Sequence, residues 1–376
     1  MGPGPSPVEP RVYEALARPV VGHLDPYLFE VFADIQAGLR TAFGTTNECT
    51  LAISGTGTSG MEAAVGNFVE PGDKVAVLVN GFFCERIAAI AERLGARVVR
   101  LEKPWGTVFD ADETGEFIRR ERPRLVAFVH GETSTGVLQE GKAICDAAHE
   151  ADALVIGDCV TSLGNVPVDI DATGIDVAYS CSQKGLGCVP GLAPITVSPG
   201  ALAVLRSRPS PPPSFYLDLL LINDYWTARK YHHTASASLY YALHEALGII
   251  AEEGLERRHA RIRTNHGAFV AGIEAMGLQM HVAEGHRLFP LNTVRVPDGL
   301  SDAAVRRHLL EDRGIEILGG FGQLTGQVFR IGIMGAGSTR ENVLLVLEAL
   351  GAALAREGYH ATGDGRAVAE KWYAGR

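Results

Sequence analysis

Between Thr50 and Val197, short apolar segments alternate with segments of helical pattern, and this alternation constrains the fold more than any other feature. Each apolar segment is rich in β-branched residues, which is typical of a strand buried between layers of helices. The predicted strands are Thr50–Ile53, Lys74–Val79, Arg97–Leu101, Leu125–Val129, Ala153–Ile156, Val177–Tyr179 and Pro194–Val197. The predicted helices between them are Gly60–Phe68, Glu85–Leu94, Thr114–Glu121 and Lys142–Glu150. The order predicts an α/β fold with a mostly parallel, doubly wound, seven-stranded sheet whose functional residues gather where strands end.

A second, smaller unit is expected because 376 residues exceed the roughly 250–300 at which a single core stops growing. After a proline-rich segment at residues 207–214, the pattern changes to two long helices, Ala237–Glu253 and Leu255–Met276. An α+β pattern follows, with strands Asn292–Val296, Ile315–Leu318 and Val328–Gly332 and helices Asp302–Arg313 and Thr339–Glu357. We therefore expect an N-terminal arm over residues 1–20, a large domain with a connecting helix over 21–254 and a small α+β domain over 255–376. The polar tail His360–Arg376 is expected to be partly mobile.

The charge balance argues against several classes of partner. The net charge of −10 opposes binding to nucleic acid or to an anionic membrane. The apolar runs are far shorter than the roughly 18–20 residues that a membrane helix needs. The six cysteines form no CxxC pair and the N-terminus lacks a signal-peptide pattern, so we expect a cytoplasmic protein with reduced thiols and no metal site.

A glycine-rich loop, Ser54-Gly55-Thr56-Gly57-Thr58-Ser59-Gly60, follows the first predicted strand and leads directly into a helix. Glycines let the backbone approach a ligand, hydroxyls donate hydrogen bonds, and the free N–H groups of a helix start favour an anion. The loop has neither the lysine of a nucleotide-binding P-loop nor the spacing of a dinucleotide fingerprint. It indicates a phosphate site or, alternatively, a capped helix start without a ligand.

Two further residues stand at predicted strand ends. Asp158 ends the apolar run Leu154–Gly157, and Lys184 follows a strand among small and polar neighbours, whereas most lysines are solvated on a helix face. A phosphate site, an acid and a lysine at the ends of strands of one sheet are what pyridoxal 5′-phosphate requires. They supply a phosphate anchor, a partner for the pyridine nitrogen and an amine that condenses with the aldehyde. The combination predicts this cofactor, with Lys184 and Asp158 as catalytic residues.

The sequence also resembles the class V aminotransferases of fold type I, and within them the alanine–glyoxylate and serine–glyoxylate aminotransferases. The motifs that carry the resemblance are GPGPS at the arm, SGTGTSGMEA, EPGDKV followed by NG, HGETSTGV, GDCVTSLG, SQKGLG, YHHT and FRIG. It extends to about Glu357. The resemblance implies a pyridoxal-phosphate transaminase that moves an amino group from a small L-amino acid, alanine or serine, to glyoxylate or a similar 2-oxo acid.

The resemblance implies roles for individual residues. Lys184 is similar to the lysine that binds the cofactor covalently and shuttles the substrate's α-proton, and Asp158 to the acid at the pyridine nitrogen. The implied cofactor contacts are Thr56, Gly57, Thr58 and Gln183 at the phosphate, Phe83 on the ring, with Phe82 as a competitor, and Thr133 at the phenolic oxygen.

Further members of the implied site lie later in the chain. Tyr231 and Thr234 match residues that reach the phosphate of the neighbouring subunit, which implies a homodimer with shared active sites. Arg330 is embedded in an apolar strand, where an unpaired charge is costly. A substrate carboxylate bound in bidentate fashion accounts for it.

Alternatives remain open at this stage. A class V transaminase with another substrate pair, ureidoglycine and glyoxylate or 2-aminoethylphosphonate and pyruvate, fits the same motifs. A sulfur-removing lyase of the same fold needs a thiol well downstream of the lysine, yet the last cysteine, Cys188, is only four residues after Lys184. A binding protein that retains the fold without activity is disfavoured because both Lys184 and Asp158 are present.

Overall fold

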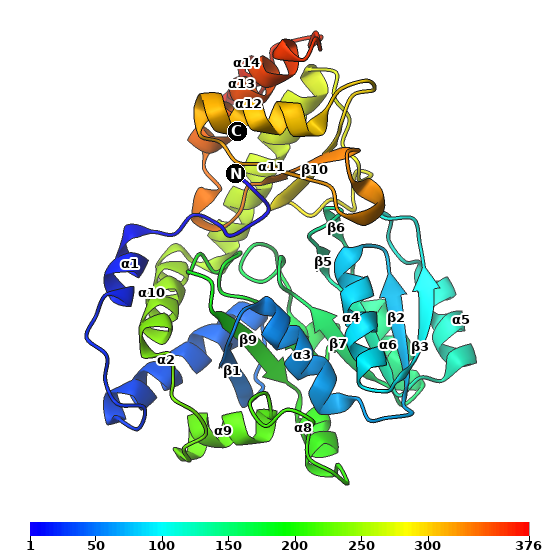
Figure 1. Cartoon of the computed structure of the whole chain (residues 1–376), viewed down its shortest axis with the longest axis vertical. Coiled ribbons are helices and arrows are strands. Elements are labelled where there is room, and N and C mark those ends of the chain that lie inside the picture. The colour runs from blue at the N-terminus through cyan, green and yellow to red at the C-terminus, as the bar shows by residue number, and fades with distance from the viewer. Residues whose placement is uncertain (376) are drawn as a thin grey trace.

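A seven-stranded sheet forms the centre of the larger unit in the computed structural model, which describes residues 1–375 (Figure 1). Its strands are β1 (Cys49–Ser54), β2 (Lys74–Val79), β3 (Arg97–Glu102), β4 (Leu125–Val129), β7 (Leu154–Asp158), β8 (Val177–Tyr179) and β9 (Leu192–Val197). They lie in the order β1-β9-β8-β7-β4-β2-β3. Strand β9 is antiparallel to both of its neighbours and the other pairs are parallel. The predicted mostly parallel α/β sheet is confirmed.

Helices pack on this sheet because its strands are apolar on both faces; β1, β4 and β9 are buried along their whole length. The helices that the sequence predicted here are α3 (Gly57–Phe68), α4 (Phe82–Arg93), α5 (Ala111–Glu121), α6 (Lys142–Glu150), α10 (Ala237–Glu253) and α11 (Leu255–Ala275). In this unit, five helices were not predicted: α1 (Pro10–Leu16), α2 (Pro26–Phe43), α7 (Ile170–Thr173), α8 (Pro199–Arg206) and α9 (Leu219–Ala228). None of the helices in residues 1–375 combines the length and apolarity that crossing a membrane requires.

Helix α2 is the longest of those that were missed, although the sequence carries its start signal. Asp25 is the N-cap, its side chain accepts a hydrogen bond from the Tyr27 N–H at 2.9 Å, and Pro26 occupies the first turn. Gly44, in the left-handed conformation, ends the helix. Its buried face packs on β1 and on α10.

The C-terminal unit contains a three-stranded antiparallel sheet in the order β10-β12-β11. Its elements are β10 (Leu291–Arg295), α12 (Asp302–Arg313), β11 (Leu318–Gly319), η1 (Gly322–Leu324), β12 (Val328–Gly332), η2 (Gly335–Gly337), α13 (Arg340–Arg356) and α14 (Gly365–Ala374). A separate hydrophobic cluster runs from Ala268 to Ala369, whereas the main cluster runs from Val12 to Ile250. The division into residues 1–20, 21–254 and 255–376 stays a prediction, which the separation of these clusters supports.

One expectation for this unit was wrong. The strand expected at Ile315–Leu318 is only Leu318–Gly319, because no other residue of that segment pairs with β12. The tail contains a helix that was not predicted, α14: Asp364 caps it, Ala369 is buried, and the Tyr373 hydroxyl donates to Asn265 Oδ1 at 2.7 Å. Arg376 lies outside the described residues.

The N-terminal arm lies across both units (Figure 1). The Gly332 N–H donates to the Met1 carbonyl at 2.8 Å, and the Ser6 N–H donates to the Gln183 carbonyl at 2.8 Å. The Ser6 hydroxyl donates to the Lys184 carbonyl at 2.8 Å. Gly4 has a φ of 123°, which other residues rarely adopt, and a Cβ there would lie 2.7 Å from Lys184 Cε, so glycine is favoured where the arm passes the lysine.

Candidate active site

The carboxyl ends of β7 and β8 bring Asp158 close to the loop that carries Lys184. Asp158 is 2% exposed and lies in register with Tyr179. The Tyr179 hydroxyl donates to Asp158 Oδ2 at 2.8 Å, and the Val160 N–H donates to Oδ1 at 2.8 Å. Burial raises the pKa of Asp158 to about 7, while the nearby Lys184 opposes that rise. The two hydrogen bonds therefore fix the carboxyl group in place, and a cationic partner would stabilise its charged form.

Lys184 lies in the turn between β8 and β9, partly buried beneath the N-terminal arm. Its Nζ donates to the Pro3 carbonyl. Burial lowers the pKa of Lys184, which favours the free amine that a nucleophile or base needs. The sequence prediction of a poised, not solvated, lysine agrees with this environment.

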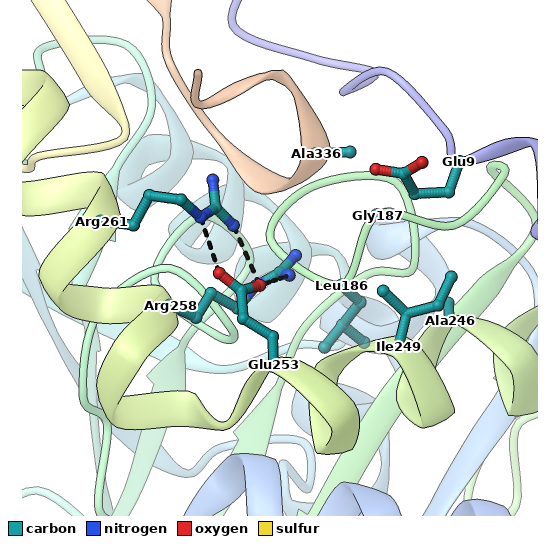
Figure 2. A pocket seen from close by; sticks show the side chains of 9 residues that line it. All are labelled: Glu9, Leu186, Gly187, Ala246, Ile249, Glu253, Arg258, Arg261 and Ala336. Atoms are coloured by element: carbon teal, nitrogen blue, oxygen red, sulfur yellow. Dashed lines mark hydrogen bonds and ion pairs between the residues drawn. The ribbon is translucent and has the colours of Figure 1, made fainter. Parts of the chain in front are cut away.

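An ion-pair cluster of Glu253, Arg258 and Arg261 lies beside Leu186 and Gly187, the residues that follow the Lys184 turn (Figure 2). Arg258 donates to the Gly185 carbonyl at 2.7 Å and to the Gly164 carbonyl at 3.0 Å. Glu253 accepts hydrogen bonds from Arg258 at 2.8 Å and from Arg261 at 2.6 Å. A cavity of about 240 Å³ lies between this cluster, the Lys184 turn and the arm. Glu253, at the end of α10, pairs with Arg258 and Arg261 of α11, and Arg258 joins this pair of helices to the turn.

The glycine-rich loop runs into the start of α3. Its N-cap, Thr56, makes no side-chain capping hydrogen bond. The Ser59 N–H donates to the Thr56 carbonyl at 2.8 Å, which leaves the N–H groups of Gly57 and Thr58 available to an anion. A Cβ at Gly57 would lie 3.1 Å from Cys181 Cβ, which shows how closely the helix start approaches the segment before Lys184. This arrangement agrees with Thr56, Gly57 and Thr58 as phosphate contacts.

Sequence reasoning missed Arg86, which lies on α4 beside this loop. Its Nη1 donates to Thr58 Oγ1 at 3.3 Å. Its guanidinium carbon lies 5.3 Å from the Phe82 ring centre and 5.0 Å from that of Phe83. Arg86 therefore adds a positive charge between the phosphate loop and the aromatic pair, with no motif spacing to signal it.

Phe82 and Phe83, both half-buried, are neighbours in the first turn of α4, and their rings meet edge to face at 5.6 Å. Phe321 lies 5.0 Å from Phe82 and 6.5 Å from Phe83, ring centre to ring centre. Phe82 contacts Phe321 more closely, which leaves Phe83 as the better candidate to cover a cofactor ring. The assignment stays a prediction.

Arg330, from β12, reaches the edge of the large unit. Its Nε donates to the Gly319 carbonyl at 2.7 Å and its Nη1 to the Thr133 carbonyl at 3.3 Å. Its Nη2 is buried and has no hydrogen-bond partner within residues 1–375. Burial lowers the pKa of Arg330 to about 10, and its guanidinium lies 3.9 Å from the ring centre of Phe321. The unsatisfied Nη2 is what a carboxylate ligand would complete.

Thr133 and Gln183 complete the predicted contacts. The Thr133 hydroxyl is 2.5 Å from that of Thr161, and Thr133 is 4% exposed. Gln183 Oε1 is buried and has no hydrogen-bond partner in the described chain. Gln183 thus retains hydrogen-bonding capacity for a ligand.

Tyr231 and Thr234 are not brought to Lys184 in one chain. Both are exposed, and the Tyr231 ring packs on those of His23 at 4.7 Å and Tyr225 at 6.5 Å. Across residues 1–375, neither forms a hydrogen bond with Lys184 or Asp158. The adjacent His233 Nε2 lies 3.2 Å from Ser54 Oγ, at the start of the glycine-rich loop.

Pyridoxal 5′-phosphate fits the residues present. The uncapped start of α3 suits its phosphate, Asp158 suits its ring nitrogen and Lys184 suits its aldehyde. The unpartnered Gln183 Oε1 and Arg330 Nη2 are buried polar atoms that otherwise need an explanation.

The cysteines near this site are poor nucleophiles. Cys181 and Cys188 are buried, and burial raises the pKa of each to about 12. Burial also raises the pKa of Cys159. A thiolate is the reactive form of cysteine, so these residues are better suited to packing than to sulfur transfer.

Comparisons with known proteins agree with this geometry. The family model described as aminotransferase class-V matches residues 11–343. The alanine–glyoxylate aminotransferase of Callithrix jacchus is 40% identical over 359 residues, 94% of this chain and 87% of that protein. The (S)-ureidoglycine–glyoxylate transaminase of Bacillus subtilis is 39% identical over 375 residues, 95% of this chain and 90% of that protein.

Solved structures give the same result. The alanine–glyoxylate aminotransferase from Nostoc sp. is 45% identical, covers 94% of each chain and superposes with a TM-score of 0.93. The ureidoglycine–glyoxylate aminotransferase from Bacillus subtilis is 40% identical, with a TM-score of 0.97 over 100% of this chain and 97% of that one.

Proposed function

Because this chain belongs to the class-V aminotransferases and is a pyridoxal 5′-phosphate-dependent enzyme, we propose that it transfers an amino group from alanine or serine to glyoxylate or a similar 2-oxo acid. The products are glycine and pyruvate or hydroxypyruvate. The observation that carries the proposal is the convergence of Lys184, Asp158 and the half-satisfied Arg330 on one edge of the sheet.

When bound, pyridoxal phosphate supplies an aldehyde that condenses with amines and a ring that withdraws electrons from the substrate's α-carbon. The protein's part is to hold charges and move one proton. Asp158, held by Tyr179 and the Val160 N–H, keeps a negative charge where a ring nitrogen is protonated. Lys184 Nζ, which is readily deprotonated, takes the α-proton and returns it. Arg330 holds the carboxylate that every donor and acceptor carries.

Ureidoglycine is the second candidate donor. The similarity between this chain and the (S)-ureidoglycine–glyoxylate transaminase of Bacillus subtilis supports this donor, because the similarity extends over 95% of this chain. 2-Aminoethylphosphonate has less support, because it lacks the carboxylate that Arg330 is placed to bind. The raised pKa values of the cysteines weigh against a lyase.

We further propose a homodimer with shared active sites, in which Tyr231 and Thr234 complete the partner's phosphate site. Six of the exposed large apolar side chains support it, because they fall in two segments: Val20, Leu24 and Tyr27 in one, and Phe215, Tyr216 and Tyr231 in the other. The contact between His23 and Tyr231 joins these segments into one surface.

The proposed location is the cytoplasm, where thiols stay reduced. All six cysteines are free and buried.

Two measurements test the proposed function. Each candidate donor is added alone to the cofactor-loaded protein, and the change in the cofactor's absorption and the keto acid formed are recorded. Alanine or serine should react; reaction with ureidoglycine alone would replace the proposed donor. Borohydride reduction with peptide mapping should label Lys184, and Lys184→Ala should lose transamination while keeping its fold. A label on another lysine would contradict the assignment.

A further inference from the structure

Glu132 is a fully buried carboxylate at the candidate active site for which the mechanism above has no use. It lies in β5 (Gly131–Glu132), which forms a short hairpin with β6 (Val137–Leu138). No salt bridge joins it to a cation within residues 1–375. Such burial is costly, so its hydrogen bonds must perform a task.

Those hydrogen bonds cap the start of α4. Glu132 Oε2 accepts from the Phe83 N–H at 3.0 Å, and Oε1 accepts from the Ser134 N–H at 2.8 Å. The Ser134 hydroxyl in turn accepts from the Phe82 N–H at 2.9 Å. The N-cap of α4 is Gly81, which has no side chain to satisfy these N–H groups.

Gly81 is required for this contact. A Cβ there would lie 2.3 Å from Glu132 Cγ and 2.5 Å from its carboxyl carbon. Asparagine, aspartate, serine and threonine are the usual N-cap residues, and all of them carry a Cβ. The helix start that bears both phenylalanines is therefore capped by another segment of the chain.

The capping segment also touches the substrate side of the site. Between Glu132 and Ser134 lies Thr133, whose carbonyl accepts a hydrogen bond from Arg330 Nη1 at 3.3 Å. The negative charge of Glu132 opposes the effect of burial on both cations of the site, since it raises the pKa of Arg330 and of Lys184.

We propose that Glu132 is a positioning residue: it fixes the Phe83 ring over the cofactor and holds Thr133 where its carbonyl orients Arg330. The proposal rests on the proposed function, because it assigns the ring of Phe83 to the cofactor. In this proposal Glu132 acts through Phe83 and Thr133, not by direct contact with substrate or cofactor.

The test compares Glu132→Gln with Asp110→Asn. Asp110 is also a capping carboxylate, whose Oδ1 accepts from the Asp112 and Glu113 N–H groups at the start of α5. Glu132→Gln should weaken pyridoxal phosphate binding about tenfold, equal to about 1.4 kcal/mol, and change the circular dichroism of the bound cofactor. It should also raise KM for both substrates. Asp110→Asn should lower the melting temperature without these changes.

A double-mutant cycle with Phe83→Ala tests the route of the effect. If Glu132 acts through Phe83, Glu132→Gln should change cofactor affinity much less in the Phe83→Ala background than in wild type. Additive losses, or a cofactor affinity and dichroism in Glu132→Gln equal to those of Asp110→Asn, would overturn the proposal.

Two further measurements keep the outcome clear. If Glu132→Gln does not fold, Ser134→Ala is used, which removes the acceptor of the Phe82 N–H and the hydroxyl beside Glu132. It should weaken cofactor binding several-fold, and unchanged binding overturns the proposal. Borohydride labelling of wild type separates the two levels of inference. Labelled Lys184 with normal binding in Glu132→Gln rejects only the role of Glu132, whereas no label on Lys184 rejects the proposed site.

Discussion

Asp158 and Lys184 are buried so that the charged form of each is disfavoured. Burial raises the pKa of Asp158 to about 7 and lowers that of Lys184. Among the residues that the structure describes, the Asp158 carboxylate accepts hydrogen bonds only from the Tyr179 hydroxyl and the Val160 N–H. A cation placed against it would stabilise its charged form. The residue pair is thus prepared for a cofactor with a basic ring nitrogen and an aldehyde.

The raised pKa of Asp158 predicts a pH effect on the cofactor-free protein. Its folded-state pKa of about 7 exceeds its ordinary value of 3.8, so stability is fully present below about 4 and is lost as the pH rises to about 7. Asp158→Asn removes this titration while its neighbours Tyr179, Glu132 and Lys184 remain. Between pH 4 and 8, wild type should therefore lose on the order of 1–3 kcal/mol more than the variant. Urea unfolding at several pH values measures this, and parallel curves for the two proteins would contradict it.

Arg330→Lys should raise KM for the amino donor and the keto acid alike, by about tenfold or more. A guanidinium donates two parallel hydrogen bonds to a carboxylate, and an ammonium group cannot. Lysine also has no nitrogen at the position of the unpaired Arg330 Nη2. Arg295→Lys, the same change at an exposed position on the adjacent β10, is the control and should leave both values unchanged. Steady-state kinetics, with the concentration of each substrate varied in turn, measures both KM values. An effect on one substrate alone would mean that Arg330 recognises a side chain.

At the scale of the elements, the start of α3 must lie close to the strands. A Cβ at Gly60 would lie 3.1 Å from Ala193 Cβ and 3.4 Å from Tyr179 Cβ. Both atoms are fixed to strand backbones and cannot rotate away. A Cβ at Gly66, later in the same helix, would meet its nearest neighbour only at 4.0 Å.

These two glycines give opposite predictions. Gly60→Ala should push the helix start away from β8 and weaken cofactor binding several-fold. Gly66→Ala should stabilise the protein by up to about 1 kcal/mol, since alanine is the better helix residue, and leave binding unchanged. Calorimetry and cofactor titration measure both quantities. Equal cofactor affinity in the two variants would mean that the position of the helix start does not determine how tightly the phosphate is bound.

The elements also show what the sequence could predict. Local patterns were sufficient for the sheet strands, since all except the edge strand β3 are mainly apolar runs between turns. They were also sufficient to place the loop, Asp158 and Lys184 at strand ends. They were not sufficient for Glu132 or Arg86, because their roles depend on contacts with Phe83 and Thr58 from other segments. Helix α14 was missed because its few buried residues are dispersed among polar ones.

At the scale of the whole molecule, the exposed Tyr231 and Thr234 leave the phosphate site incomplete under the shared-site proposal. Mixing Lys184→Ala with Tyr231→Ala/Thr234→Ala should restore up to about a quarter of wild-type activity per total site, because a hybrid dimer holds one intact site. Activity and native mass spectrometry are measured together. Hybrids that form without activity would show that both residues serve their own subunit.

The N-terminal arm has a consequence for how the protein is made. Met1 and Ser6 leave the ribosome long before their partners, Gly332, Gln183 and Lys184. The large sheet can form during synthesis, but the arm cannot take its final place until β12 has been translated. Until then, the lysine turn lacks part of its cover, so the active site of the nascent chain is completed only after β12 has left the ribosome.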